Sequence, residues 1–111
     1  MTQKEFTKQI DKQGLERLRV RLTIDNGILV DLVFQYESYI DNKWREIVRY
    51  DVAHGFFHRD LISPGGDKEK KRIEISDMRM AATFAEQDIK DKWEFYKNKY
   101  LKELKRKQND K

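Results

Sequence analysis

Residues 17–36 read RLRVRLTIDNGILVDLVFQY and carry the clearest structural pattern of the sequence. In its first half, apolar and polar side chains alternate, which is typical of a β-strand with one buried face. The turn residues Asp25-Asn26-Gly27 interrupt the alternation, and a second apolar segment then runs from Ile28 to about Ile40. The sequence therefore predicts an antiparallel hairpin. Its expected buried side chains are Leu18, Val20, Leu22, Ile24, Val30, Leu32, Phe34 and Tyr36.

The register of this hairpin depends on the length of its turn. A two-residue turn at Asn26-Gly27 places Leu22 opposite Asp31, which puts a carboxylate on the buried face. A three-residue turn with a left-handed Gly27 instead pairs Leu22 with Val30 and aligns the two apolar faces. We therefore predict the three-residue turn. The expected pairs are Ile24 with Ile28, Leu22 with Val30, Val20 with Leu32 and Leu18 with Phe34.

The same reasoning extends the sheet beyond this hairpin. A three-residue turn is expected at residues 41–43, followed by strands at about 44–53 and 56–62. Residues 63–67 have the composition of a loop, and a short strand is expected at 71–75. Across the 41–43 turn the expected pairs are Tyr36 with Val48, Phe34 with Tyr50 and Leu32 with Val52.

A long helix is predicted from about Met78 to Arg106. Ser76 or Asp77 can cap its start. Its apolar residues recur at helical spacing within an arc of roughly 140°, so one side of the helix is expected to lie on the sheet. They are Ala81, Ala82, Ala85, Ile89, Trp93, Tyr96, Tyr100 and Leu104.

Together these segments predict one α+β domain of 111 residues. It consists of an antiparallel meander sheet of four to five strands with one long C-terminal helix packed on one face. Near the N-terminus, the spacing of Phe6 and Ile10 favours a short helix that Gly14 ends. The expected parts are an N-terminal segment (1–14), the sheet (15–75), the helix (76–106) and a frayed basic tail (107–111).

Composition narrows the functional classes. The formal charge of +4 comes from 24 basic against 20 acidic side chains, which is a mixed surface rather than a polycation. The absence of cysteine excludes disulfides, thiolate metal sites and cysteine nucleophiles. The sequence shows neither the apolar segment of a signal peptide nor a membrane-spanning run. We therefore expect a cytoplasmic protein that does not contact membranes.

Both histidines fall in residues 49–60, RYDVAHGFFHRD. With a turn at His54-Gly55, Asp51 faces His58 and Arg49 faces Asp60 across a strand pair. These four side chains are expected on the sheet face opposite the helix.

This cluster supports two interpretations. In the catalytic one, His58 is a general base or acid, Asp51 orients it, and Arg49 stabilises developing negative charge. In the other, the residues form a ladder of cross-strand ion pairs on a solvated face. A metal site built from the histidines and an aspartate has suitable ligand types. However, His54 lies at the turn and His58 lies on a strand, so we expect neither a metal nor another cofactor.

Arginines suggest a third role for the same face. Arg17, Arg19 and Arg21 alternate along the first strand and can contact RNA phosphates, while nearby aromatic side chains can stack on bases. The candidate binding residues are Arg17, Arg19, Arg21, Arg45, Asp60 and His54. On the helix, Phe84 and Phe95 lie away from the main apolar stripe and need another cover. Either the N-terminal segment or a homodimer or partner protein is expected to supply it.

Residues 49–61 and 81–96 resemble an uncharacterised family of small archaeal and bacterial proteins. That family has an RYDxAHGxxHRD core followed by a helix with a Trp-x-x-Tyr pattern, which Trp93 and Tyr96 match here. The resemblance implies no activity. The Arg-x-Asp-x-Ala pattern followed by histidines is also similar to the TumE-type toxins of toxin–antitoxin pairs, although their histidine-rich continuation is missing.

Two functions follow from these observations. The first is a binding or interaction module, such as a toxin–antitoxin-like or regulatory component. The second is a small ribonuclease or other hydrolase that uses His58, Asp51 and Arg49. The catalytic version requires Asp51 and His58 to share a sheet face within hydrogen-bond distance.

Overall fold

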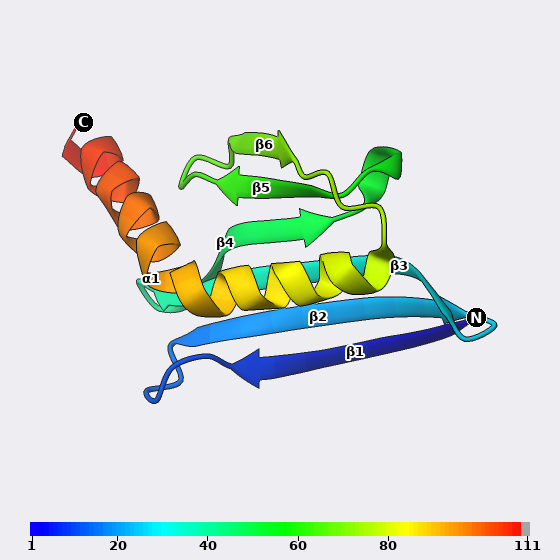
Figure 1. Cartoon of the computed structure of the whole chain (residues 1–111). Helices are drawn as coiled ribbons and strands as arrows, with labels where there is room; N and C mark the ends of the chain where they lie inside the picture. Colours follow the sequence, from blue (N-terminus) through cyan, green and yellow to red (C-terminus); the bar gives the residue numbers. More distant parts are fainter. Residues whose placement is uncertain (110–111) are drawn as a thin grey trace.

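The computed structural model describes residues 1–109, which form one antiparallel sheet with a long helix across one face (Figure 1). The six strands are hydrogen-bonded in sequence order, so the sheet is a simple meander. The α+β class and the meander are confirmed, whereas four to five strands were expected. The strands are β1 (Thr2–Gln9), β2 (Glu16–Asp25), β3 (Ile28–Ile40), β4 (Lys43–Asp51), β5 (His58–Ile62) and β6 (Lys68–Arg72).

The additional strand comes from the N-terminal segment. Instead of a short helix, residues 2–9 form β1, which pairs antiparallel with β2 so that Phe6 lies opposite Val20. The free edge of β2 offers a full set of backbone partners, and this outweighs the weak helical spacing of Phe6 and Ile10. The loop that follows is held by Asp11, whose Oδ1 accepts hydrogen bonds from three backbone amides.

The turn between β2 and β3 differs from the prediction. Asn26 and Gly27 both have positive φ, 51° and 77°, and form a two-residue turn in which Ile24 pairs with Leu29. An irregularity between Thr23 and Ile24 then shifts the register by one residue, so Leu22 faces Leu32 rather than Val30. The extra residue of this β-bulge is Val30, which is 46% exposed rather than buried as expected. Beyond it, the apolar faces of the two strands are aligned without a longer turn.

The turn between β3 and β4 likewise combines two residues with a register shift in the strands. Asp41 and Asn42 have φ values of 51° and 66°, and Ile40 pairs with Lys43, so this turn also has two residues rather than three. A register shift between Tyr36 and Glu37 follows. Beyond it, the predicted pairs Tyr36 with Val48 and Phe34 with Tyr50 are confirmed. The pair Leu32 with Val52 does not form, because β4 ends at Asp51.

The last two strands are displaced from their expected positions. Residues 53–55 form a short 3-10 turn, η1, so β5 begins at His58 rather than at residue 56. β6 covers residues 68–72 rather than 71–75. The chain then crosses to the helix side of the sheet.

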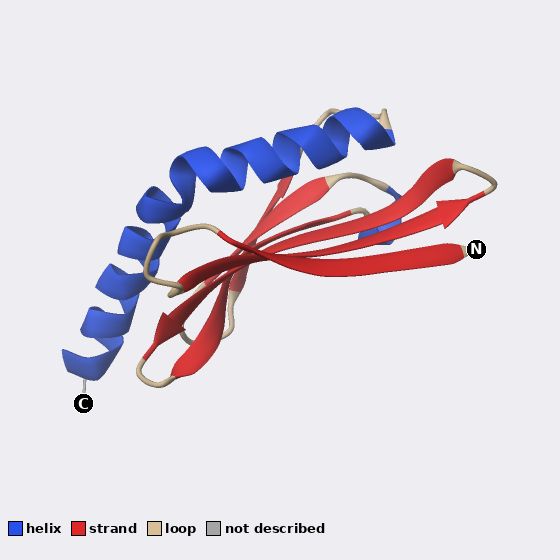
Figure 2. Ribbon diagram, turned by 90° about the horizontal axis from the view of Figure 1, so that it is seen from below, coloured by secondary structure: helices blue, strands red, loops and turns tan. Residues whose placement is uncertain are grey.

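The helix α1 (Met78–Asn109) begins as predicted and runs three residues further than expected. Asp77 caps it by accepting a hydrogen bond from the Met80 amide at 2.9 Å. Residues 107–109 of the predicted frayed tail are helical, and residues 110–111 lie outside the described part. Figure 2 shows the helix running over the sheet and then bending towards its C-terminal end. In the described chain, no helix is both long and apolar enough to span a membrane.

The core lies between α1 and one face of the sheet. Ala81, Ala85 and Ile89 are at most 1% exposed, and their small or branched side chains let the helix approach the strands closely. From the sheet, the core includes Leu18, Val20, Leu32, Phe34, Tyr36, Val48 and Tyr50. The other face of the sheet is therefore the one that is free to carry function.

Candidate functional site

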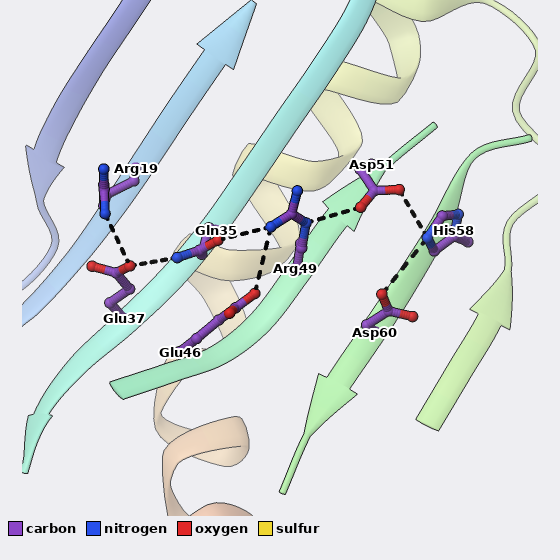
Figure 3. Close-up of polar contacts among 8 residues, drawn as sticks. All are labelled: Arg19, Gln35, Glu37, Glu46, Arg49, Asp51, His58 and Asp60. Carbon is purple, nitrogen blue, oxygen red and sulfur yellow. Dashed lines mark hydrogen bonds and ion pairs between the residues drawn. The ribbon is translucent and has the colours of Figure 1, made fainter. Parts of the chain in front are cut away.

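The predicted register of the β4–β5 hairpin is confirmed. Asp51 pairs with His58, and Arg49 pairs with Asp60. Their side chains lie together on the sheet face opposite the helix, here called the outer face (Figure 3). The short η1 turn sets this register, and His54 and Gly55 both adopt positive φ in it.

His58 lies at the centre of a buried acidic cluster. Its Nε2 is 2.9 Å from Asp51 Oδ1 and 3.7 Å from Asp60 Oδ2. Its Nδ1 is 3.2 Å from the carbonyl oxygen of Phe56. The residue is 1% exposed. Nδ1 faces a carbonyl oxygen, which can only accept a hydrogen bond, and Nε2 faces two carboxylates, which can only accept when they are ionised.

Asp51 is held in place from two further directions. Arg49 Nε donates to its Oδ2 at 2.9 Å, and the backbone amide of Ala53 donates to its Oδ1 at 3.0 Å. Asp51 is 7% exposed, so this carboxylate is a fixed part of the sheet rather than a mobile surface group.

Arg49 continues the network across the sheet. Its Nη1 lies 3.4 Å from Gln35 Oε1 and 4.0 Å from Glu46 Oε1. Figure 3 marks both contacts with dashed lines. Burial raises the pKa of Glu46, and the positive charge of Arg49 opposes this effect. Gln35 in turn donates to Glu37. The outer face is therefore one connected network rather than a set of separate ion pairs.

Glu37 connects this network to the arginines of β2. Arg17 lies 2.6 Å from its Oε1, and Arg19 lies 3.4 Å from its Oε2. Arg17 also stacks on Trp44, with 3.8 Å between the guanidinium carbon and the ring centroid. Glu37 is 5% exposed, so its charge is shared between two guanidinium groups at a buried position.

Acids and bases on this face differ in depth. Glu37, Asp51 and Asp60 are all less than 9% exposed, because their short side chains stay close to the sheet. The arginines are longer and reach further outward, and their side chains are 56% exposed at Arg19, 32% at Arg49 and 27% at Arg17. Solvent therefore meets guanidinium groups above a layer of carboxylates.

A shallow groove of about 260 Å³ lies over β1 to β4 on the outer face. Three arginines line it, namely Arg19, Arg21 and Arg49, together with the acidic Glu5. Arg21 is exposed and forms no ion pair within residues 1–109. The exposed strand β6 adds Lys68, Lys70 and Arg72 beside β5.

Two of the predicted binding residues lie apart from this network. Arg45 contacts the Ile40 carbonyl and lies 3.9 Å from Asp41, because the bulge in β4 reverses the alternation of side chains before it. His54 is exposed in the η1 turn, 6.1 Å from His58 between ring centroids. The sequence did not identify Glu37 and Gln35 as the residues that connect the arginines of β2 with Arg49.

The two helix phenylalanines differ in their surroundings. Phe84 packs edge-on against Tyr50 and Phe57, at centroid distances of 6.1 and 6.3 Å, and is 40% exposed. Phe95 is 65% exposed and contacts Tyr96. The N-terminal segment forms β1 and leaves both rings partly open, so a homodimer or partner protein at this place stays a prediction.

The matching family model describes a domain of unknown function (DUF7718) and covers residues 1–106. The chain belongs to this family, which confirms the predicted membership of an uncharacterised family. No curated protein and no solved structure matches the chain.

Proposed function

We propose that the protein is a small binding module that holds single-stranded RNA on the outer face of its sheet. The observation that carries this proposal is the layered charge of that face, where exposed arginines lie above buried carboxylates. Guanidinium groups contact phosphates with two parallel hydrogen bonds, which suits them to a nucleic-acid backbone.

The groove on the outer face provides a concave surface next to these arginines. Arg19, Arg21 and Arg49 surround a hollow of about 260 Å³, and within residues 1–109 Arg21 has no carboxylate partner that RNA would have to displace. Tyr39, 38% exposed, lies 5.3 Å from the Trp44 ring and offers an aromatic surface on the same face. A cytoplasmic location, which we expect from the sequence, gives access to RNA.

The same geometry favours binding over hydrolysis. A general base needs a nitrogen that can reach its substrate, whereas His58 is 1% exposed and both of its nitrogens are engaged. The hydrolase interpretation therefore receives less support than binding, even though Asp51 and His58 are in contact.

Fluorescence anisotropy with a labelled single-stranded RNA oligonucleotide tests the proposal. Wild-type protein is expected to bind with an affinity that falls as salt rises, and Arg21→Glu is expected to weaken binding roughly tenfold or more. The control is Arg79→Glu, which makes the same charge change at an exposed position on the helix. Equal loss in the two variants contradicts the proposal, because it indicates attraction by net charge alone.

The RNA recovered from the same samples distinguishes the hydrolase alternative. Intact RNA after incubation with wild-type protein supports a binding module. Cleavage by the wild type but not by His58→Ala overturns it in favour of the hydrolase.

A further inference from the structure

One buried carboxylate of the outer face lacks a partner. Asp60 is 4% exposed, yet its Oδ1 has no hydrogen-bond partner among residues 1–109. Its Oδ2 points at His58 Nε2 from 3.7 Å, which is beyond hydrogen-bond distance. Burying a carboxylate without hydrogen bonds costs several kilocalories per mole in general, so the position requires a compensating positive group.

The imidazole of His58 leads to the same requirement. The Phe56 carbonyl can only accept, so the 3.2 Å contact with Nδ1 places a proton on that nitrogen. In a neutral ring with this tautomer, Nε2 directs its lone pair at Asp51 Oδ1, only 2.9 Å away. Two facing lone pairs repel each other. A cation must therefore lie at Nε2, and it is either a proton or a metal ion.

We propose that Asp51, His58 and Asp60 bind one divalent transition-metal ion of the class of Zn²⁺ or Mn²⁺. A proton on Nε2 hydrogen-bonds Asp51 and leaves Asp60 unsatisfied, whereas a metal ion neutralises both carboxylates. One ligand atom from each residue lies within 4.8 Å of the others, and all three residues are buried. Figure 3 shows His58 between the two carboxylates.

The distances fit an ion after small movements. With metal–ligand bonds of about 2.1 Å, neighbouring ligand atoms lie roughly 3.0–3.5 Å apart. The Nε2 contacts of 2.9 Å and 3.7 Å fall just outside this range on either side. The ligand oxygens of Asp51 and Asp60 lie within 4.8 Å of each other, so binding also brings the two carboxylates closer together. Binding replaces any proton on Nε2 with the ion and draws Asp60 inward.

The surrounding hydrogen bonds are those of a metal site. A metal-binding imidazole usually donates its other N–H to a carbonyl or carboxylate, as His58 Nδ1 does to Phe56. Arg49 orients Asp51 through Oδ2, so Oδ1 stays directed at His58. One imidazole with two carboxylates suits Zn²⁺, Mn²⁺ or Fe²⁺, whereas Mg²⁺ prefers oxygen ligands alone.

Isothermal titration of untagged, chelator-treated protein with ZnCl₂, MnCl₂ and MgCl₂ tests the proposal. Because the three ligands are buried, each ion is also added before the protein is refolded from urea. The thermal unfolding midpoint of the refolded protein is then compared with that of the metal-free sample. We expect one Zn²⁺ or Mn²⁺ per chain and a midpoint raised by roughly 10 °C at a hundredfold excess over Kd.

Two variants make the test specific. Asp60→Asn keeps the side-chain shape and removes an uncompensated buried charge, so it is expected to fold without metal and to bind the ion at least about 100-fold more weakly. His54→Asn removes the exposed imidazole, tolerates the local positive φ, and is expected to bind like the wild type. The proposal is overturned if neither ion binds wild-type protein by either route, or if Asp60→Asn binds as tightly.

Discussion

Lys97 on α1 reaches Glu16 at the start of β2, with 2.6 Å between Nζ and Oε2. Glu16 is 2% exposed, and its Oε1 accepts a hydrogen bond from the Tyr36 hydroxyl at 2.6 Å. This pair lies on the helix side of the sheet, where it connects the two layers of the fold.

Removing the lysine charge should leave Glu16 buried with one remaining partner. Lys97→Met keeps most of the aliphatic chain and is expected to lower the free energy of unfolding by about 2–4 kcal/mol. The matched control is Lys99→Met, which breaks an exposed pair with Glu103 and is expected to cost less than about 0.5 kcal/mol. Urea unfolding measures both, and similar losses would show that the buried pair contributes no more than the exposed one.

Stability should fall at high pH because of three buried tyrosines. Burial raises the pKa of Tyr96 to about 12, and the hydrogen bond to Asp88 adds to this effect. Burial likewise raises the pKa of Tyr36 and Tyr50. The folded state keeps these protons where the unfolded chain releases them, so the stabilisation is complete below the usual value of 10.0 and is lost above it.

The free energy of unfolding is therefore expected to decrease from pH 10 towards pH 12, by at most about 1.4 kcal/mol per pH unit for each tyrosine. Urea unfolding at several pH values, with tyrosinate absorbance as a second probe, measures this slope. Tyr96→Phe should make it shallower. A slope that this substitution leaves unchanged would assign the loss to other groups.

The two-residue turn at Asn26-Gly27 predicts that a side chain at Gly27 lowers the free energy of unfolding. Its φ is 77°, and no atom lies within 4 Å of an added Cβ, so Gly27→Ala is strained only through the backbone. We expect a loss of about 1–2 kcal/mol in the free energy of unfolding. Gly65→Ala, where φ is not in the left-handed region, is the control and should change little. If both variants have wild-type stability, the turn has another conformation.

Substitution of the two helix phenylalanines should distinguish a role in packing from a role in an interface. Phe84→Ser loses the ring contacts with Tyr50 and Phe57 and is expected to cost about 1–2 kcal/mol. Phe95→Ser should stay within about 0.5 kcal/mol of wild type. Light scattering after size-exclusion chromatography shows whether the wild type is a dimer that Phe95→Ser dissociates. A monomeric wild type would remove the homodimer from consideration.

Alternation and turn chemistry were sufficient to predict the class, the meander and most of the strand faces, whereas Val30 and Arg45, which lie at or before a bulge, were assigned to the wrong face. The register of Asp51 against His58 followed from the turn at His54-Gly55 alone, because a strand pair is fixed once its turn is placed. The pairing of Tyr36 with Val48 was predicted correctly from a turn of the wrong length. Between β3 and β4 the bulge shifts the register in the same direction and by the same amount as a longer turn, so periodicity alone cannot distinguish them there.

Other features depend on tertiary context that the sequence does not display. All eight residues of β1 are exposed, so they lack the buried-face pattern by which strands are recognised. The burial of Asp60 and His58 depends on the neighbouring strand β6 and on the η1 turn. Neither could be foreseen from residue types, and both change the expected chemistry of the cluster.

The strand order of the sheet also bears on how the chain folds. Each strand's partner is the next one in the sequence, so every pairing closes only a short loop. Loop-closure entropy therefore stays small at each step, and contact order is low for a sheet protein. The sheet can grow one hairpin at a time, with helix docking last, and we expect rapid folding with few opportunities for mispaired strands.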